Sequence, residues 1–533
     1  MLNYLTMKTQ IVFCITLALA AMTCFPAHAA KKPNVIIILA DDLGYSDIGC
    51  YGSEIATPHL DGLAANGLRF SQFYNTSRCC PTRASILTGL YPHQVNMGFM
   101  VDSGNKAREI GNDAYAGDLN KTTPTIAEIL RPAGYRTYAS GKWHVVKKPI
   151  TEQDTSNWPL QRGFDRYYGI LDGSCNLFKP PVTRDNTRFA NPSEDKDYPS
   201  DNYYFTDAIG DHATAFLKDH AAAHADKPFF LYLTFTAPHW PMHAPEQWIQ
   251  KYKGRYDGGY TPIHQARLKR LKDMKLIPGD CRPETMSNWE NVKRKDWEAR
   301  CMEVYAAMVE CMDANIGKVL TQLRAMGELD NTLIVFLSDN GACAESLGRT
   351  PDAPMPGPVN TYISYGANWA KVSNTPYRLF KERSHEGGIR TPFIAHWPNG
   401  ITRKGEIERQ QGHIIDLMAT AVDLAQVKPT FPKPLEGTSL VPAFKGEPLK
   451  RTNALFFSHN RAAALRDGDW KLVTEAANNK NRWELYDMSK DQTEMDNLAS
   501  KHPERAERLR KQWEDLAKRH GAVPWIFSPP YAE

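Results

Sequence analysis

Three apolar runs constrain the fold of this chain more than any other feature of its sequence. They cover residues 34–40, 228–236 and 332–337, and they are rich in β-branched and aromatic side chains. Such a run without polar alternation is typical of a strand buried on both faces, as in a parallel sheet covered by helices. Amphipathic stretches such as 56–67 and 302–329 predict the covering helices. The sequence therefore predicts an α/β fold with a large, mostly parallel sheet between helices.

Polar side chains follow each of these three runs. Asp41 and Asp42 come after the first, His239 after the second, and Asp339 with Asn340 after the third. Ligands of open α/β sheets bind at the carboxyl ends of the strands, so these residues are candidates for one site. Their oxygens suit calcium or magnesium better than zinc. Each piece alone also fits a helix cap or a turn, and Asp-Asn-Gly is a common turn sequence.

A further predicted strand, at 135–140, is followed by Gly-Lys-Trp-His. Lys142 and His144 therefore lie after a strand end as well, although an isolated Lys or His is usually a solvated or hydrogen-bonded side chain. Their place in the pattern implicates the same edge of the sheet.

The sequence Ser-Arg-Cys-Cys-Pro-Thr-Arg-Ala-Ser-Ile-Leu-Thr-Gly at 77–89 predicts a short helix. Pro81 suits the first helical turn and Gly89 a helix end. Cys79 then lies at the helix N-terminus, where free N–H groups favour an anion, and Arg83 lies one turn further on. A structural cysteine pair beneath a helix cap is the simpler interpretation of the same residues.

The pattern of predicted elements changes near residue 451. Short runs at 454–458, 463–466, 470–474 and 483–486 predict strands, and Asp467-Gly468 is a hairpin signal. A helix is predicted over 503–519. We therefore expect a catalytic domain over 30–450 and a C-terminal α+β subdomain over 451–533, in which a small antiparallel sheet is joined by the helix.

The N-terminal 29 residues have the pattern of a secretory signal peptide. An apolar stretch at 11–22 follows Lys8 and precedes Ala27-His28-Ala29, a small-x-small cleavage pattern, and the start could be Met1 or Met7. No later segment is apolar enough to span a bilayer. The sequence thus predicts an exported, periplasmic or secreted protein without stable membrane insertion. Eight cysteines remain after cleavage, and an oxidising compartment makes a disulfide plausible.

Composition excludes some function classes. The formal net charge is +4, hydrophobic residues make up 42% of the chain, and no basic run is interleaved with aromatic residues. These values are typical of a globular protein and give no sign of nucleic-acid binding.

The order of the motifs resembles the type I, formylglycine-dependent sulfatases of the alkaline-phosphatase superfamily. Residues 79–89 fill every fixed position of the signature Cys-x-Pro-Ser/Thr-Arg-x-x-x-Leu-Thr-Gly, with Cys80 at the variable position. The stretches 374–381 and 483–487 resemble bacterial arylsulfatases in particular. The resemblance implies an alkaline-phosphatase-like fold and hydrolysis of sulfate monoesters.

The resemblance also implies a role for each candidate residue. A formylglycine-generating or anaerobic maturating enzyme would convert Cys79 to formylglycine, whose hydrate supplies the nucleophile. One calcium ion would be held by a set of five residues: Asp41, Asp42, residue 79, Asp339 and Asn340. Arg83 would hold the hydrated aldehyde, and His144 would assist the release of sulfate. The sulfate group would be bound by Lys142, His239 and Lys381, and His239 would protonate the leaving oxygen.

The sequence leaves the natural substrate open. Sulfated carbohydrates are the expected substrates, with aryl sulfates also accepted. Trp240, Tyr168 and Tyr362 could stack on a sugar or an aryl ring, or belong to the core. One alternative is a phosphate or phosphonate monoester hydrolase of the same superfamily. The other is a non-catalytic protein that binds sulfated glycans and keeps Cys79 as a thiol.

Overall fold

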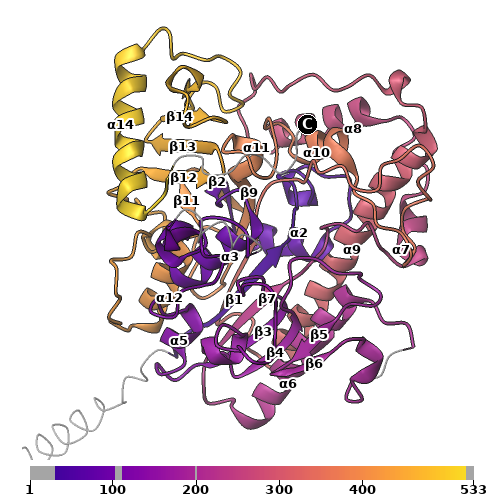
Figure 1. Ribbon diagram of the computed structural model, residues 1–533. Helices are drawn as coiled ribbons and strands as arrows, with labels where there is room; N and C mark the ends of the chain where they lie inside the picture. Colours follow the sequence, from indigo (N-terminus) through magenta and orange to yellow (C-terminus); the bar gives the residue numbers. More distant parts are fainter. Residues whose placement is uncertain (1–30, 102–110, 199–200, 524–533) are drawn as a thin grey trace, which may run out of the picture.

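The computed structural model describes residues 31–101, 111–198 and 201–523 (Figure 1), so the predicted signal peptide lies outside the described residues. In these ranges, eleven strands form one sheet in the order β10-β2-β9-β8-β1-β7-β3-β4-β5-β6, and β11 also pairs with β2. The central strands are β1 (Asn34–Ala40), β7 (Phe229–Thr234), β8 (Thr332–Ser338) and β3 (Arg136–Lys142). The three apolar runs are therefore strands of one sheet, as predicted, and β1 lies between β7 and β8.

Parallel pairing dominates the centre of this sheet. β1 pairs in parallel with β7 and β8, and β3 pairs in parallel with β7 and with β4 (Arg166–Ile170). β9 (Arg390–His396) runs antiparallel to β8 and to β2 (Leu68–Tyr74). The remaining strands are short: β5 (Val182–Arg184), β6 (Thr187–Phe189), β10 (Glu406–Glu408) and β11 (Gly412–His413). The mixed but mostly parallel sheet confirms the predicted fold class.

Helices cover both faces of the sheet. Alternate residues of β1 point to opposite faces, and both sets are apolar, so each face is buried. Ile36 and Ile38 join one core, and Val35, Ile37 and Leu39 join the other. The first core includes residues of α2 (Pro58–Ala65), α6 (Phe205–Ala223), α9 (Lys295–Ala325) and α10 (Gly366–Ser373). The second includes residues of α3 (Cys79–Thr88), α5 (Ile126–Leu130), α12 (Asp416–Ala425) and α13 (Val441–Phe444). The sheet is thus the middle layer of three.

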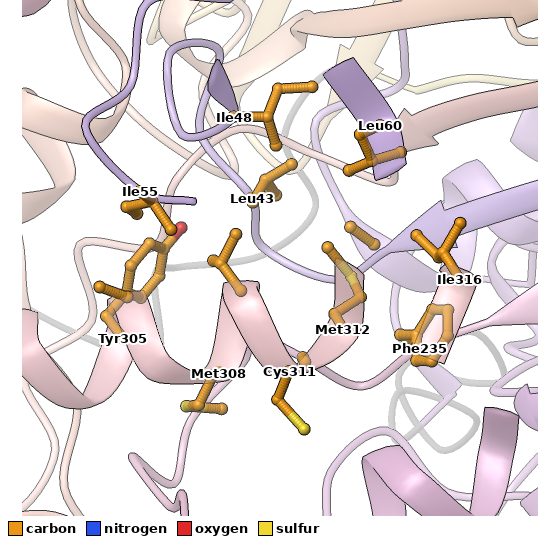
Figure 2. Packing of buried hydrophobic residues seen from close by; sticks show 14 of the residues in the cluster. Leu43, Ile48, Ile55, Leu60, Phe235, Tyr305, Met308, Cys311, Met312 and Ile316 are labelled. Atoms are coloured by element: carbon orange, nitrogen blue, oxygen red, sulfur yellow. The ribbon is translucent and has the colours of Figure 1, made fainter. Parts of the chain in front are cut away.

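The segment that follows β1 packs on α9, the longest helix shown. Figure 2 shows Ile55 of this segment next to Tyr305 of α9, and Leu43 above the same helix further along. The insertion between β7 and α9 contains α7 (Glu246–Ile249) and α8 (Tyr260–Asp273). Arg267 of α8 is fully buried and pairs with Asp47 at 2.5 Å and with Glu54 at 2.8 Å. The insertion is therefore anchored to the loop that follows the first central strand.

The C-terminal part forms a separate antiparallel sheet with a terminal helix, as predicted (Figure 1, yellow and orange). Its strands are β12 (Leu455–His459), β13 (Ala462–Asp467), β14 (Trp470–Thr474) and β15 (Glu484–Asp487), and the helix is α14 (Pro503–His520). Leu509 and Trp513 of α14 pack on Phe456 and Leu465. None of the helices in the described ranges combines the length and apolarity needed to cross a membrane. The eight cysteines in those ranges are free, so the plausible disulfide does not occur among them.

Candidate active site

Four adjacent strands bring the predicted polar residues to one edge of the sheet. β8, β1, β7 and β3 are consecutive in the sheet, and Ala40 is in register with Ser338. The amide of Asp41 donates to the carbonyl of Ala237, and the amide of Asp339 donates to that of Ala40, both at 3.1 Å. The loops that carry the carboxylates and His239 are therefore fixed to one another at the carboxyl ends of the strands.

Helix α3 is anchored to this edge by Arg83. Cys79 is the first residue of the helix, and Gly89 ends it in the left-handed conformation with φ 71°. The Arg83 guanidinium donates from Nε and Nη2 to Oδ2 of Asp339 at 3.0 and 2.7 Å, and from Nη1 to the carbonyl of Lys142 at 2.8 Å. Because Arg83 is fully buried, it fixes residue 79 relative to both strand ends.

Two lysines face the aspartates that follow β1. Nζ of Lys142 lies 2.6 Å from Oδ2 of Asp41, and Nζ of Lys381 lies 2.9 Å from Oδ2 of Asp42. Lys381 comes from the loop that precedes α11 (Glu386–Ile389). Asp42 itself has φ 65°, in the left-handed region, and non-glycine residues in that conformation are frequent at functional sites.

The oxygen atoms of this group fit a hard cation. Oδ1 of Asp41 and Oδ1 of Asn340 are buried and have no hydrogen-bond partner. Burial, reinforced by the charge of Asp41, raises the pKa of Asp339 to about 8, although Arg83 and Lys142 act in the opposite direction. Unpaired buried carboxylate and amide oxygens are costly unless a cation coordinates them. The donor set of Asp41, Asp42, Asp339 and Asn340 is therefore chemically suited to calcium.

Cys79 lies beside Cys80 and His144, whose ligand atoms are within 4.8 Å of its own. Nε2 of His144 is 3.1 Å from Sγ of Cys80. A hydrogen bond from Cys80 and the positive charge of Lys142 hold the pKa of the Cys79 thiol well below its usual range, despite burial. Burial lowers the pKa of His144 to about 4, so this ring is neutral at pH 7.

His239 is oriented by its own loop. Its Nδ1 lies 2.6 Å from the carbonyl oxygen of Trp240, so Nδ1 carries a proton and donates to that carbonyl. Nε2 faces Nζ of Lys381 at 3.4 Å and Oδ2 of Asp42 at 3.4 Å. Burial lowers the pKa of His239 to about 4, with Lys381 acting in the same direction and Asp42 opposing it. The structure thus brings every sequence-predicted site residue into one cluster.

Two further residues of this region, Glu345 and Gly173, are not predicted as site residues by the sequence. Glu345, five residues after Asn340, lies 3.0 Å from Arg78 and accepts a hydrogen bond from the Trp240 indole at 2.6 Å. Gly173 lies against His144, because a Cβ at this glycine would come within 2.3 Å of the imidazole. Both belong to irregular loops, whose positions periodicity does not predict.

The structure distinguishes the aromatic residues that belong to the core from those that are exposed to solvent. Tyr168 is fully buried and stacks on His212 with ring centroids 3.5 Å apart, so it belongs to the core. Trp240 is half-buried, and Tyr362 is 54% exposed.

A buried ionic network connects the loop of Lys381 to the C-terminal sheet. Lys471 of β14 lies 2.7 Å from both Glu386 and Glu494, and all three side chains are fully buried. Glu386 also pairs with Arg390 at 3.1 Å. The C-terminal sheet therefore supports α11, directly after the loop that supplies Lys381.

The chain is similar to known proteins over most of its length. The Sulfatase family model matches residues 33–427, and the model of the N-sulphoglucosamine sulphohydrolase C-terminal region matches residues 376–520. An arylsulfatase of Klebsiella aerogenes is 35% identical over 76% of this chain and 89% of its own. The N-acetylgalactosamine-6-sulfatase of Rattus norvegicus is 28% identical over 85% of this chain and 73% of its own.

A solved structure gives the same result at the level of the fold. Ps i-CgsB in complex with k-i-k-neocarrahexaose superposes with a TM-score of 0.68 at 26% identity, over 94% of this chain and 96% of that one. With the family match spanning most of the chain and a 35% identical arylsulfatase, this protein belongs to the sulfatase family and is a sulfatase.

Proposed function

We propose that this sulfatase hydrolyses sulfate monoesters of carbohydrates, and aryl sulfates as well, with formylglycine at position 79 and one calcium ion. The observation that carries the proposal is the pair of unpartnered buried oxygens of Asp41 and Asn340 at the edge that also holds Cys79. A catalytic nucleophile and a hard-cation donor set in one buried cluster support ester hydrolysis better than binding alone.

The metal would be held by Asp41, Asp42, Asp339, Asn340 and residue 79. When bound there, calcium would supply Lewis-acid stabilisation of the sulfate group. The hydrated formylglycine supplies two hydroxyl groups on one carbon, one for attack on sulfur and one for the release of sulfate. Arg83 keeps residue 79 and Asp339 in place through its paired hydrogen bonds. Lys142 and Lys381, which face the aspartates in this structure, bind the sulfate oxygens as fixed positive charges.

His239 and His144 exchange protons with the reacting group. His239 keeps its Nδ1 proton on the Trp240 carbonyl, so Nε2 is the atom that exchanges a proton with the leaving oxygen. A bound sulfate ester adds negative charge beside this ring and raises the pKa of His239 above its value of about 4. His144, neutral and next to Cys79, accepts the proton that the second hydroxyl loses.

The carbohydrate substrate class is supported by the relatives. One relative is named for N-acetylgalactosamine 6-sulfate and another for aryl sulfates, and Ps i-CgsB was solved with k-i-k-neocarrahexaose. We further propose that residues 1–29 direct export to the periplasm or medium, that the catalytic domain spans 30–450 with a C-terminal subdomain at 451–533, and that a formylglycine-generating or anaerobic maturating enzyme modifies Cys79.

The experiment is sulfate release measured by ion chromatography. The chain is co-expressed with a formylglycine-generating enzyme and given sulfated galactose, sulfated N-acetylglucosamine and 4-nitrophenyl sulfate, each beside its phosphate analogue. We expect sulfate release from the sugar and aryl esters. Turnover of the phosphate analogues alone would establish the phosphoester-hydrolase alternative, and tight binding without release would establish the glycan-binding alternative.

A further inference from the structure

Trp240 and Tyr362 form an aromatic corner directly outside the buried site. Trp240 follows His239, and their ring centroids are 4.4 Å apart. Tyr362 meets Trp240 at 5.4 Å with an interplanar angle of 65°. Since the rings stand nearly perpendicular, their exposed surfaces form an angle rather than a flat wall.

Tyr362 also reaches the opposite side of the site. Its hydroxyl is hydrogen-bonded by the side chain of Ser174. The preceding residue, Gly173, lies against the imidazole of His144. Tyr362 therefore lies between Trp240, next to His239, and the loop of Gly173 and Ser174, next to His144.

The exposure of Tyr362 belongs to a wider feature of its loop. Among the described residues, the exposed large hydrophobic side chains are Met355, Val359, Tyr362 and Met495, and three of these belong to residues 355–362. Of these, Tyr362 is the one whose ring contacts Trp240, next to His239.

Glu345 places a carboxylate at this corner, where it pairs with Arg78 at 3.0 Å. Its carboxylate accepts the indole N–H of Trp240 at 2.6 Å, and its side chain remains 25% exposed. Lys381, with Arg78, holds the pKa of Glu345 well below its usual range, so the group is ionised near pH 7. An anionic substituent on the leaving group would meet this charge, whereas a hydroxyl group can donate a hydrogen bond to it.

We propose that Trp240 and Tyr362 receive the ring that carries the sulfate ester, and that this ring is an uncharged hexopyranose whose C–H face packs on the two aromatic rings. Glu345 is the specificity-determining residue that disfavours uronic acids and neighbouring sulfate groups. This inference rests on the proposed sulfate-ester hydrolysis at the same site.

The test compares Tyr362→Ala and Tyr362→Phe in the matured full chain, with Met355→Ala as a control at another exposed position of the loop. For a neutral hexose 6-sulfate, we expect Tyr362→Ala to raise KM by about tenfold and to change kcat by less than about twofold. Tyr362→Phe, which keeps the ring, and Met355→Ala should stay close to wild type. Inhibition by inorganic sulfate, which occupies only the sulfate-binding residues, should be the same in all four proteins.

A second experiment tests the role of the Glu345 carboxylate. Wild type should favour the neutral hexose sulfate over a uronic acid 2-sulfate by about a hundredfold in kcat/KM, and Glu345→Gln should reduce this preference by about tenfold. Equal turnover of the two sugars by wild type, or an unchanged KM in Tyr362→Ala, would overturn the inference while leaving sulfate-ester hydrolysis intact. Absence of sulfate release from every ester would overturn the proposed function, and this inference with it.

Discussion

Nζ of Lys381 lies 3.4 Å from Nε2 of His239, and both atoms face Oδ2 of Asp42, at 2.9 and 3.4 Å. One carboxylate oxygen therefore balances a permanent cation and a ring that can accept a proton. This arrangement suits an acid that is protonated when an anionic ester is present, because burial, together with Lys381 and against Asp42, keeps the pKa of His239 low in the free enzyme.

The proton that His239 would give to the leaving oxygen can be tested by mutation. Replacement of His239 by Gln should lower kcat by about a hundredfold or more for a sugar sulfate, because its alkoxide leaving group needs a proton. For 4-nitrophenyl sulfate, whose leaving group departs as an anion, the loss should stay below about tenfold. Equal losses for both esters would contradict the assignment of His239 as the general acid.

Residue 79 is tested by Cys79→Ala. This variant should lose about a thousandfold or more of kcat, because the nucleophile is gone, while circular dichroism and the melting temperature stay near wild type. Cys281→Ser removes a partly exposed thiol and serves as the control. Mass spectrometry of the tryptic peptide should detect the aldehyde in wild type and in Cys281→Ser but not in Cys79→Ala, and full activity of Cys79→Ala would disprove the mechanism.

Removal of the metal should affect both activity and stability. A chelator should abolish sulfate release and lower the melting temperature by a few degrees, since a ligand that binds only the native state stabilises it. Calcium should restore both quantities. In Asp339→Asn, addition of calcium should no longer raise the melting temperature. Recovery with zinc but not with calcium would contradict the oxygen-donor assignment.

The anchor between the insertion and the β1 loop gives a stability prediction. Arg267 lowers the pKa of Glu54 from 4.5 to about 2 despite burial, so the pair stabilises the fold above pH 4.5 and loses this contribution as the pH falls toward 2. Glu54→Gln should lower the free energy of unfolding by about 2–3 kcal/mol at pH 7.

The pH dependence separates this effect from a general loss of packing. The difference between wild type and Glu54→Gln, measured by urea unfolding, should shrink between pH 4.5 and the lowest pH at which the protein folds. Glu504→Gln, at an exposed position of α14, is the matched control and should show no difference. A constant difference at all pH values would rule out the ionic contribution of Glu54.

Gly173 tests how His144 is positioned. Gly173→Ala would place a methyl group within 2.3 Å of the imidazole, so the ring must move. We expect kcat to fall by about tenfold or more with a smaller change in KM, because the step that releases sulfate is impaired. An unchanged kcat with intact His144 would show that the ring has room to shift without cost.

The sequence was most informative where burial is complete. Residues 34–40 and 332–337 were predicted as strands, and the structure ends them within one residue of these limits, because a continuous β-branched run leaves few alternatives. The short strands β5, β6 and β10 were not predicted. Their sequences mix polar and apolar residues, and they are strands because they pair with neighbouring strands. Helix α9 starts at Lys295, seven residues before the predicted start at 302, in a charged turn without an apolar repeat.

The site residues, too, were predictable where they belong to regular elements or directly follow them. Residues at the ends of apolar strands were predictable, because the topology of a parallel sheet brings strand ends together. Glu345, Gly173 and Ser174 were not, because they reach the site through irregular loops whose path depends on tertiary contacts.

The buried contact of Lys471 with Glu386 and Glu494 bears on how this protein can change over evolutionary time. A chimera that takes its last 80 or so residues from a relative without an equivalent lysine would leave the buried Glu386 with Arg390 but without Lys471, and we expect this loss of a buried partner to destabilise the fold. That damage would fall beside the loop of Lys381, so activity would suffer as well as folding. The halves of the chain are thus expected to be inherited together, and recombination between relatives should preserve residues 386, 471 and 494 as a set.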